Sequence, residues 1–478
     1  MREKLLRNKK GITLIALVIT IIVLLILAGI SISMISSQDG ILKKATGAKE
    51  ANKKASEEEY AKLEIQAALI DGEGTIDVSK LTADSDIVKA YTDNGYTYKG
   101  EGKFISKDGD EEITITKEGN IEKIAVISDV SKLTTAVTKM TKYVDNTSTT
   151  NKEAIIPRGF KVSSVTEEQK IDTGLVVIDK NGNEFVWVPV PDAVYDGTTT
   201  ITVGTYTPMA RKIDNTENYQ GVLYDLETKK ANQKVVDFST NGVGKTGYRE
   251  PSLVTGSGSD TSALLDTIEG TKYDAQYYNQ AGNYSDAKAF GKDMQEEYNN
   301  MVKSVAKYGG FYVGRYETGI ENTSKIAVSK NASATDNNTT TADASQTDTK
   351  MWYGLYNKQR TMAKDNGLDS VESSMIWGSQ YDAMMIWMQK TGTIIGTGHD
   401  TTKRNTEVIT GSSATDIINK VYDLYGCHYE WTLESANPVT RVHRGGNSGL
   451  VYAPSDRRYC NPYLANASAS SRISLYIK

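Results

Sequence analysis

The N-terminal part of the chain begins with one long apolar run. Residues 12–30 are nineteen consecutive positions without a charged side chain, and residues 1–11 before them carry five basic side chains against one acidic. At ~1.5 Å per residue, a helix of this length approaches the ~30 Å hydrocarbon thickness of a bilayer. The positive flank places the N-terminus in the cytoplasm and the rest of the chain outside. The pattern predicts a membrane span, with a cleaved secretory signal as the alternative.

A helical pattern follows the apolar run. From residue 41 to residue 69, apolar side chains recur mostly at spacings of three and four, with Lys and Glu on the other face. This periodicity is typical of an amphipathic helix. We therefore predict a transmembrane and extended helix over residues 12–70.

Short alternating runs then indicate strands. They occupy residues 71–126 and are separated by the turn signals Asn94-Gly95, Asp108-Gly109 and Gly119-Asn120. Such dipeptides between apolar runs predict antiparallel hairpins. Packed on the preceding helix, they would form a small α+β unit of pilin-like shape. Residues 127–154 are polar and rich in Thr and Lys, so we expect a linker there.

The largest predicted domain covers residues 155–478. It opens with two apolar runs on either side of Asn181-Gly182, which is a strong hairpin signal. All five tryptophans lie at or after Trp187, so the main core belongs here. Residues 373–391 carry Met and Trp at helical spacing, which is typical of a core helix. Residues 321–350 are rich in Asn, Thr, Ser, Ala and Asp and predict a mobile surface insertion.

Composition excludes several classes of function. The net charge of −5 gives no support for nucleic-acid binding, so we expect no nucleic-acid partner. The chain has two cysteines, Cys427 and Cys460, which cannot make a disulfide framework and do not have zinc-ligand spacing. No Ser-His-Asp order, paired carboxylates or phosphate-binding loop stands out. The residues alone therefore predict no catalytic site.

The N-terminus resembles the leader of type IV prepilins over Lys-Gly-Ile-Thr-Leu-Ile-Ala-Leu, residues 10–17. The resemblance implies processing between Gly11 and Ile12 and pilus-like subunits as partners. In that family the fifth mature residue is a glutamate that pairs with the amine of a neighbouring subunit, and here this residue is Ala16. Assembly into a pilus therefore stays open.

The C-terminus resembles the formylglycine-generating enzyme (sulfatase-modifying factor) family. The resemblance rests on the order of three motifs, Glu430-Trp431-Thr432, Arg444-Gly445-Gly446 and a terminal strand after Arg472. It covers about residues 155–478 and implies a C-type lectin-like fold. The catalytic cysteine pair of the family is not matched, because Cys427 and Cys460 lie far apart in sequence. We therefore predict no enzyme, with a formylglycine-generating-type oxidoreductase as the alternative.

The same resemblance implies a metal site in the loop before this strand. In the family, backbone carbonyls and a glutamate at this point can hold calcium. Carried over, the ligands are Gly426, His428 and Glu430, at alternate positions suited to oxygen donors. The alternative is that Glu430 is a hydrogen-bonded structural residue.

The last part of the chain, residues 426–478, also resembles the variable region of proteins diversified by retroelements. Residues 435–477 contain no Lys, Glu, Gln, Met or Trp, although these types make up about a fifth of the chain. Randomising the adenines of Asn codons never produces these five. Tyr and Arg among small polar neighbours are typical of a binding surface, and the alternative is that the tyrosines pack the core. The candidate binding residues are Cys427, His428, Tyr429, Asn447, Ser448, Leu450, Tyr452, Ser455, Arg457, Arg458, Tyr459, Cys460 and Tyr463.

These patterns together predict an α+β protein. It would have an N-terminal transmembrane, pilin-like long helix with a small antiparallel β domain, then a C-type lectin-like domain. We expect it at the cell membrane, with the C-terminal domain extracellular and binding a protein or cell-surface ligand through a diversified tip. A minor pilin or adhesin with a fixed tip is a further alternative.

Overall fold

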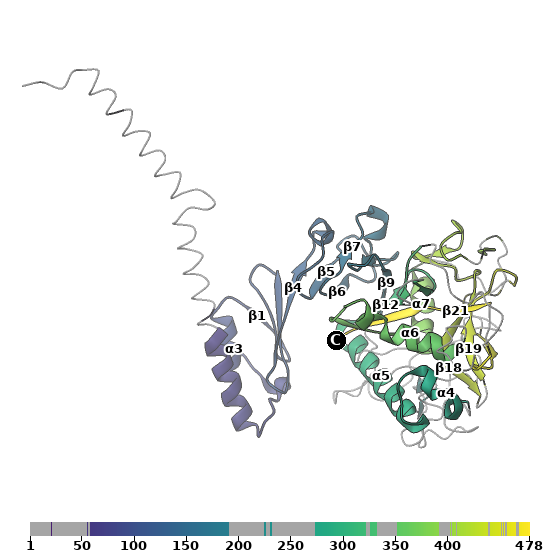
Figure 1. Ribbon diagram of the computed structural model, residues 1–478. Coiled ribbons are helices and arrows are strands. Elements are labelled where there is room, and N and C mark those ends of the chain that lie inside the picture. Colours follow the sequence, from purple (N-terminus) through teal and green to yellow (C-terminus); the bar gives the residue numbers. More distant parts are fainter. Residues whose placement is uncertain are drawn as a thin grey trace, which may run out of the picture. The chain divides into compact units, whose positions relative to one another are not determined.

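The computed structural model divides into two compact units, residues 1–123 and 124–478 (Figure 1). The described residues are 58–190, 224–225, 230–231, 273–321, 326–331, 351–391, 404–407, 409–437, 440–450, 457–464 and 468–478, with the single positions 21, 55, 402, 452 and 454.

The first unit packs two helical segments against short strands. Residues 58–71 are helical, and they are followed by η1 (Val78–Lys80), α3 (Asp86–Thr92), β1 (Thr97–Gly100), β2 (Lys103–Ile105), β3 (Glu111–Ile115) and the start of β4 (Ile121–Ile127). β2 pairs antiparallel with both β1 and β3. The signal Asp108-Gly109 lies at the β2–β3 turn as predicted, whereas Asn94-Gly95 joins α3 to β1 and makes no hairpin. Ile65 of the first helix, Val88 of α3 and Phe104 of β2 are buried in one core.

The second unit begins with strands that the sequence did not predict. The end of β4 pairs in parallel with β5 (Thr141–Val144), which pairs antiparallel with β6 (Glu153–Ile156). Residues 127–154, expected to be a linker, therefore contain β5 together with η2 (Val130–Leu133). Leu133 and Tyr143 are buried, which explains why this polar stretch is ordered.

A six-stranded sheet forms the centre of the second unit. Its strand order is β15-β22-β12-β9-β8-β7, and the strands are β7 (Lys161–Val162), β8 (Val176–Ile178), β9 (Glu184–Pro189), β12 (Gly310–Gly314), β15 (Val371–Met375) and β22 (Ile473–Ile477). β8 and β9 form the hairpin predicted at Asn181-Gly182. The terminal strand β22 lies between β15 and β12 and pairs antiparallel with both.

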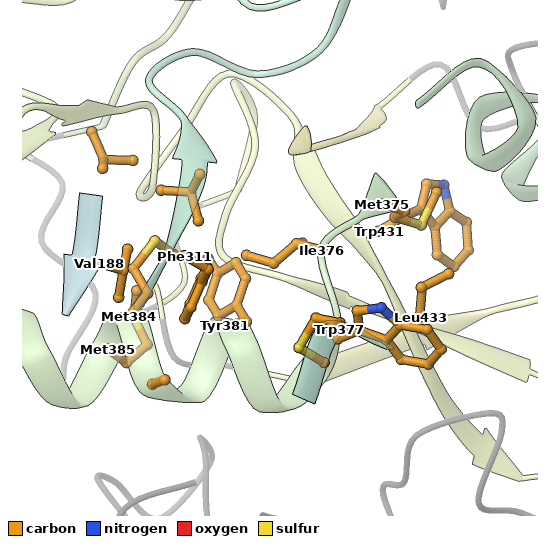
Figure 2. Close-up of a cluster of buried hydrophobic side chains, with 14 of the residues drawn as sticks. Val188, Phe311, Met375, Ile376, Trp377, Tyr381, Met384, Met385, Trp431 and Leu433 are labelled. Atoms are coloured by element: carbon orange, nitrogen blue, oxygen red, sulfur yellow. The ribbon is translucent and has the colours of Figure 1, made fainter. Parts of the chain in front are cut away.

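Both faces of this sheet are buried. Val186 and Val188 belong to one hydrophobic cluster, whereas Phe185 and Trp187, on the opposite face of the same strand, belong to another. The first cluster also contains residues of α4 (Asp274–Ala281), α5 (Ala287–Tyr308), α6 (Trp352–Asp365) and α7 (Gly378–Lys390). Figure 2 shows Tyr381, Met384 and Met385 of α7 near Val188 and Phe311. The helix expected over residues 373–391 is α7, but its first residues are instead strand β15.

A four-stranded sheet carries most of the C-terminal motifs. Its order is β20-β19-β18-β21, with β18 (Tyr429–Asn437), β19 (Thr440–Arg444), β20 (Arg457–Cys460) and β21 (Ala469–Ser471). β18 pairs antiparallel with β19 and parallel with β21. Short two-stranded ladders complete the described strands: β10 (Tyr224–Asp225) with β11 (Lys230–Ala231), β13 (Gly319–Ile320) with β14 (Ala327–Val328), and β16 (Ile417–Ile418) with β17 (Val421–Tyr422).

The predicted fold class is wrong. Among the described residues, no helix is long and apolar enough to cross a membrane. The longest is α5, with 22 residues and many charged side chains. The sheets are mixed rather than purely antiparallel, since β4 pairs in parallel with β5 and β18 with β21. Turn signals predict hairpins, in which a short turn joins two antiparallel strands. They do not predict parallel pairs, because two parallel strands are connected by a longer crossover segment.

Other predictions fall wholly or partly on residues that the structure does not describe. The apolar run of residues 12–30 lies outside the described residues except for position 21, and so do Gly11 and Ile12. Most of the helix predicted over residues 12–70 is likewise outside them. Of the insertion predicted at residues 321–350, positions 321 and 326–331 are described, and the latter contain β14.

Candidate functional site

Three buried arginines hold the C-terminal sheet in place. Arg441 donates from Nη2 to both oxygens of Asp274 in α4 at 3.0 and 2.9 Å. Arg444 Nε lies 2.8 Å from Oε2 of Glu434, and Arg472 Nε lies 3.2 Å from Oε2 of Glu430. All three side chains are fully buried. Because an unpaired charge in the interior is costly, these pairs restrict the sheet to one arrangement.

Arg472 connects several parts of the unit. Its Nη2 also contacts Oε1 of Glu430. It donates to the carbonyl oxygens of Gly314, at 2.8 Å, and Tyr422, at 2.7 Å. Burial raises the pKa of the Glu430 carboxyl to about 7, although the positive charge of Arg472 acts in the opposite direction. Glu430 is therefore held from both oxygens by one guanidinium.

This arrangement does not fit the calcium site that the family resemblance implied. Both carboxylate oxygens of Glu430 face Arg472, so neither is directed to a cation. The backbone N–H of His428 donates to Oε1 of Glu317 at 2.9 Å. Gly426 is buried against Asn405, whose backbone carbonyl oxygen would lie 2.3 Å from an added Cβ. The set therefore lacks its one carboxylate ligand, the donor on which a calcium site of this kind would depend most.

A row of aromatic rings leads from the core to the surface of the C-terminal sheet. We use the name Tyr-Arg row for Tyr429, His443, Tyr452 and Arg458. The ring centroids of Tyr429 and His443 are 4.4 Å apart, and those of Tyr429 and Tyr452 are 6.1 Å apart and stacked. The guanidinium carbon of Arg458 lies 3.8 Å from the ring centroid of Tyr452. Tyr429 and His443 are buried, Tyr452 is half-buried and Arg458 is exposed.

Pairing of the strands explains why these residues meet. β18, β19 and β20 place Trp431, His443 and Arg458 opposite one another across three neighbouring strands. Such residues share one face of a sheet, and Tyr429 lies two positions from Trp431 on that face. Burial, followed by the charge of Arg458, lowers the pKa of His443 to about 3, so its ring is neutral. Its Nδ1 has no hydrogen-bond partner within the described part of the chain.

Tyr463 belongs to a second aromatic group. Its ring centroid lies 4.3 Å from that of Tyr273 and 5.9 Å from that of Tyr277 in α4, with which it is stacked. Tyr277 is in turn stacked on the buried Tyr353 at 5.6 Å. The sequence showed a group of tyrosines before α5 but no reason to connect them with residue 463. That connection depends on the Arg441–Asp274 pair, which brings α4 to the C-terminal sheet.

The remaining candidate binding residues are divided between interior and surface. Cys427 and His428 are buried, and Asn447 is buried in a turn where its Oδ1 accepts hydrogen bonds from the backbone N–H groups of Gly449 and Leu450. The side chain of Leu450 is exposed. Of the five other candidates, Ser448 and Cys460 are half-buried. Arg457 and Tyr459 lie in β20, but their side chains are outside the description, and Ser455 lies outside the described residues altogether.

A buried polar cluster lies below the loop that precedes β18. Nδ1 of His428 is 2.7 Å from Oε2 of Glu317 and 3.2 Å from Sγ of Cys427. Burial opposes protonation of His428, but the Glu317 carboxylate outweighs this effect and raises the pKa of the imidazole. Burial and the same carboxylate also raise the pKa of the Cys427 thiol. Sequence reasoning missed Glu317, because it lies 111 positions from His428 and carries no local motif.

The electrostatics of this cluster argue against a nucleophilic cysteine. A reactive cysteine needs a lowered pKa and access to the substrate, whereas Cys427 has a raised pKa and is fully buried. Burial also raises the pKa of Asp416 to about 7 and that of Asp423 to about 6. When ionised, these two carboxylates repel a thiolate and so raise the pKa of the Cys427 thiol further.

A separate cavity of about 330 Å³ lies between α5, α6, β15 and β22. Its charged groups satisfy one another: Arg360 Nε is 3.1 Å from Oε2 of the buried Glu297, and the hydroxyl of Tyr476 donates to Glu372 at 2.9 Å. Asp293 pairs with Arg360 and accepts a hydrogen bond from Tyr284. Arg360, Glu297, Asp293, Glu372 and Tyr476, which line the cavity, are therefore already engaged with partners.

Neither the family models nor the curated proteins nor the solved structures include a significant match to this chain.

Proposed function

We propose that this chain is a ligand-binding protein whose ligand contacts the Tyr-Arg row and the exposed residues between positions 448 and 464. The observation that carries the proposal is the stacking of Arg458 on Tyr452 above buried rings. Rings and guanidinium groups fixed in this way contribute strongly to binding, because little conformational entropy is lost when a ligand covers them. The stack also holds the Arg458 cation over an aromatic face, which is a favourable arrangement.

The chemistry of the row indicates what part of a ligand it would contact. Tyr452 offers a flat, partly apolar surface, and Arg458 offers hydrogen-bond donors and a positive charge. A protein or cell-surface molecule with an acidic or hydrogen-bond-accepting group beside a flat apolar group fits this pair. His443 supplies no positive charge, since its pKa is low.

The distribution of burial supports diversification of this surface by a retroelement. Arg441, Arg444, Gly445, Gly446 and Arg472 are buried and form the paired scaffold. Apart from Ser468 and Lys478, the exposed and half-buried positions described in residues 426–478 lie between residues 448 and 464. Substitutions at exposed positions usually change stability little, so the chain can vary its contacts there without losing the scaffold.

Binding should be tested on arrays of immobilised proteins and glycans with the full chain. We expect Tyr452→Ala and Arg458→Ala each to weaken binding to any ligand found by at least about tenfold, or about 1.4 kcal/mol. Tyr60→Ala and Arg158→Ala are matched controls, because both side chains are half-exposed and lie outside the Tyr-Arg row. Unchanged binding by both test variants would contradict the proposal.

Diversification has its own test. The codons for residues 426–478 should be sequenced across a population of source cells. We expect substitutions to be concentrated at the exposed positions, with Arg444, Gly445 and Gly446 unchanged. A uniform sequence would contradict diversification and leave a fixed binding surface, as in an adhesin.

A further inference from the structure

The interior of the second unit brings three donor groups of different chemistry to one point. A carboxylate oxygen of Glu317, the sulfur of Cys427 and a ring nitrogen of His428 all lie within 4.8 Å of one another, and all three residues are buried. The closest approaches are 2.7 Å between His428 Nδ1 and Glu317 Oε2 and 3.2 Å between His428 Nδ1 and Cys427 Sγ. From this convergence we infer that the three residues bind a divalent transition-metal ion of the zinc class.

The donor separations are close to those that such an ion requires. Zinc bonds are ~2.3 Å to sulfur and ~2.0–2.1 Å to nitrogen and oxygen, so a tetrahedral site separates neighbouring donors by roughly 3.3–3.6 Å. The two closest approaches are about half an ångström shorter, as expected where protons rather than a metal ion lie between the donors. Binding would release the proton of the Cys427 thiol to solvent and displace any proton from Nδ1 of His428, whose lone pair would then face the ion. The donors would move apart by the same half ångström.

The backbone is arranged so that two consecutive side chains face Glu317. In an extended strand, neighbouring side chains point to opposite faces. Cys427, two residues before β18, instead has a left-handed φ of 61°, which interrupts this alternation. A non-glycine residue in this conformation is uncommon and costs conformational free energy. Its backbone N–H donates to the carbonyl oxygen of Asn405 at 2.8 Å, and its carbonyl accepts from Ser448 at 2.9 Å, which holds the turn in place.

Buried acidic side chains around the cluster, which carry negative charge once they are ionised, are a second indication of a cation. Asp416 and Asp423 are buried near the thiol and influence it electrostatically. Asp423 is held by Asn405 and Thr410, and Asp416 by backbone N–H groups of Asn405 and Tyr425. Within the described residues, neither these carboxylates nor Glu317 forms an ion pair with Lys or Arg. A divalent ion would offset the cost of burying this charge.

The mixture of donors selects the kind of ion. Calcium takes only oxygen ligands, whereas a thiolate, an imidazole and a carboxylate together suit zinc or cobalt. Three protein donors are also the number found in many zinc sites with an exchangeable fourth ligand. The inference is independent of the proposed binding surface, because Tyr452 and Arg458 are not among the metal ligands.

The test is titration of Zn²⁺ and Co²⁺ into the full chain, purified without metal and kept reduced. We expect one ion per chain and, with Co²⁺, the absorption that a thiolate ligand produces. Cys427→Ser should weaken Co²⁺ binding at least tenfold and remove this absorption. Cys460→Ser is the matched control, since it changes the other of the two cysteines, and it should leave both unchanged. Glu317→Gln should weaken binding but keep the thiolate absorption.

A second measurement covers the case in which Cys427→Ser does not fold. In the wild-type protein, Zn²⁺ should slow alkylation of Cys427 at least tenfold and leave the alkylation rate of Cys460 unchanged. The inference is overturned if the wild-type protein binds neither Zn²⁺ nor Co²⁺. It is also overturned if folded Cys427→Ser binds as tightly as the wild type, or if Cys460→Ser loses the ion.

Discussion

Replacing Arg472 by methionine should destabilise the second unit by about 5 kcal/mol. The substitution leaves Glu430 buried without the guanidinium that holds both of its oxygens. Breaking a buried ion pair in this way costs ~3–5 kcal/mol. The carbonyl oxygens of Gly314 and Tyr422 also lose a donor, which adds ~1 kcal/mol for each bond. Relaxation of the surrounding structure recovers part of this free energy. We therefore expect a total destabilisation at the lower end of the summed range.

Tryptophan fluorescence during urea unfolding measures this change directly. All five tryptophans lie in the second unit, so their fluorescence reports on that unit alone. A domain is stable by about 5–15 kcal/mol, and a loss of about 5 kcal/mol should move the midpoint to much lower urea or abolish folding at 37 °C. Glu430→Met combined with Arg472→Met should be more stable than Arg472→Met alone, because the double variant buries no charge.

Two results would refute this reasoning. One is a loss of less than about 1 kcal/mol in Arg472→Met, which is the size of an exposed ion pair. The other is a double variant whose destabilisation equals the sum of the two single variants, since that would mean no coupling between the residues.

Calcium serves as a control. Adding it should leave the wild-type midpoint unchanged, because Arg472 already engages both oxygens of Glu430.

Three further predictions concern packing and pH. Gly310→Ala should lower the free energy of unfolding by ~1–3 kcal/mol, because its Cβ would lie 2.4 Å from Cζ2 of Trp187; thermal unfolding checks this, and an unchanged midpoint would contradict it. The pKa of His443 is lowered from 6.5 to about 3, so the stability that its neutral ring provides should be complete above pH 6.5 and decline as pH falls towards 3. Urea unfolding between pH 7 and 4 measures this, and in His443→Gln the free energy of unfolding should depend less on pH. Burial raises the pKa of Tyr91 from 10.0 to about 12, so the first unit should lose stability as pH rises from 10 to 12, and Tyr91→Phe should lose less over that range in circular dichroism.

Local signals in the sequence identified several elements correctly. The Asn-Gly dipeptide marked the β8–β9 hairpin, and the Met and Trp spacing marked α7 as a core helix. Both signals depend on neighbouring residues only, which is why they can be read without the fold. The same reasoning failed for β5, where a polar stretch is ordered by a few buried side chains.

The candidate sites depended on contacts that no local pattern contains. The sequence showed that the C-terminal segment holds Arg, Tyr and small polar residues, but not which of them face the interior. Asp274 and Arg441 are 167 positions apart, and Glu317 and His428 are 111 apart. A buried charged side chain is stable only beside an opposite charge or a hydrogen-bonding partner. The fold decides which distant residue lies close enough to be that partner.

By itself, the sequence determined the periodicity of the elements, the position of the main core in the C-terminal domain and the chemistry available near the C-terminus. The tertiary structure decided which of those residues serve as scaffold and which as surface. It pairs Glu430 with Arg472 and leaves Arg458 exposed on Tyr452. The reason is physical: periodicity is a property of adjacent residues, whereas burial and charge pairing are properties of residues brought together by the whole chain.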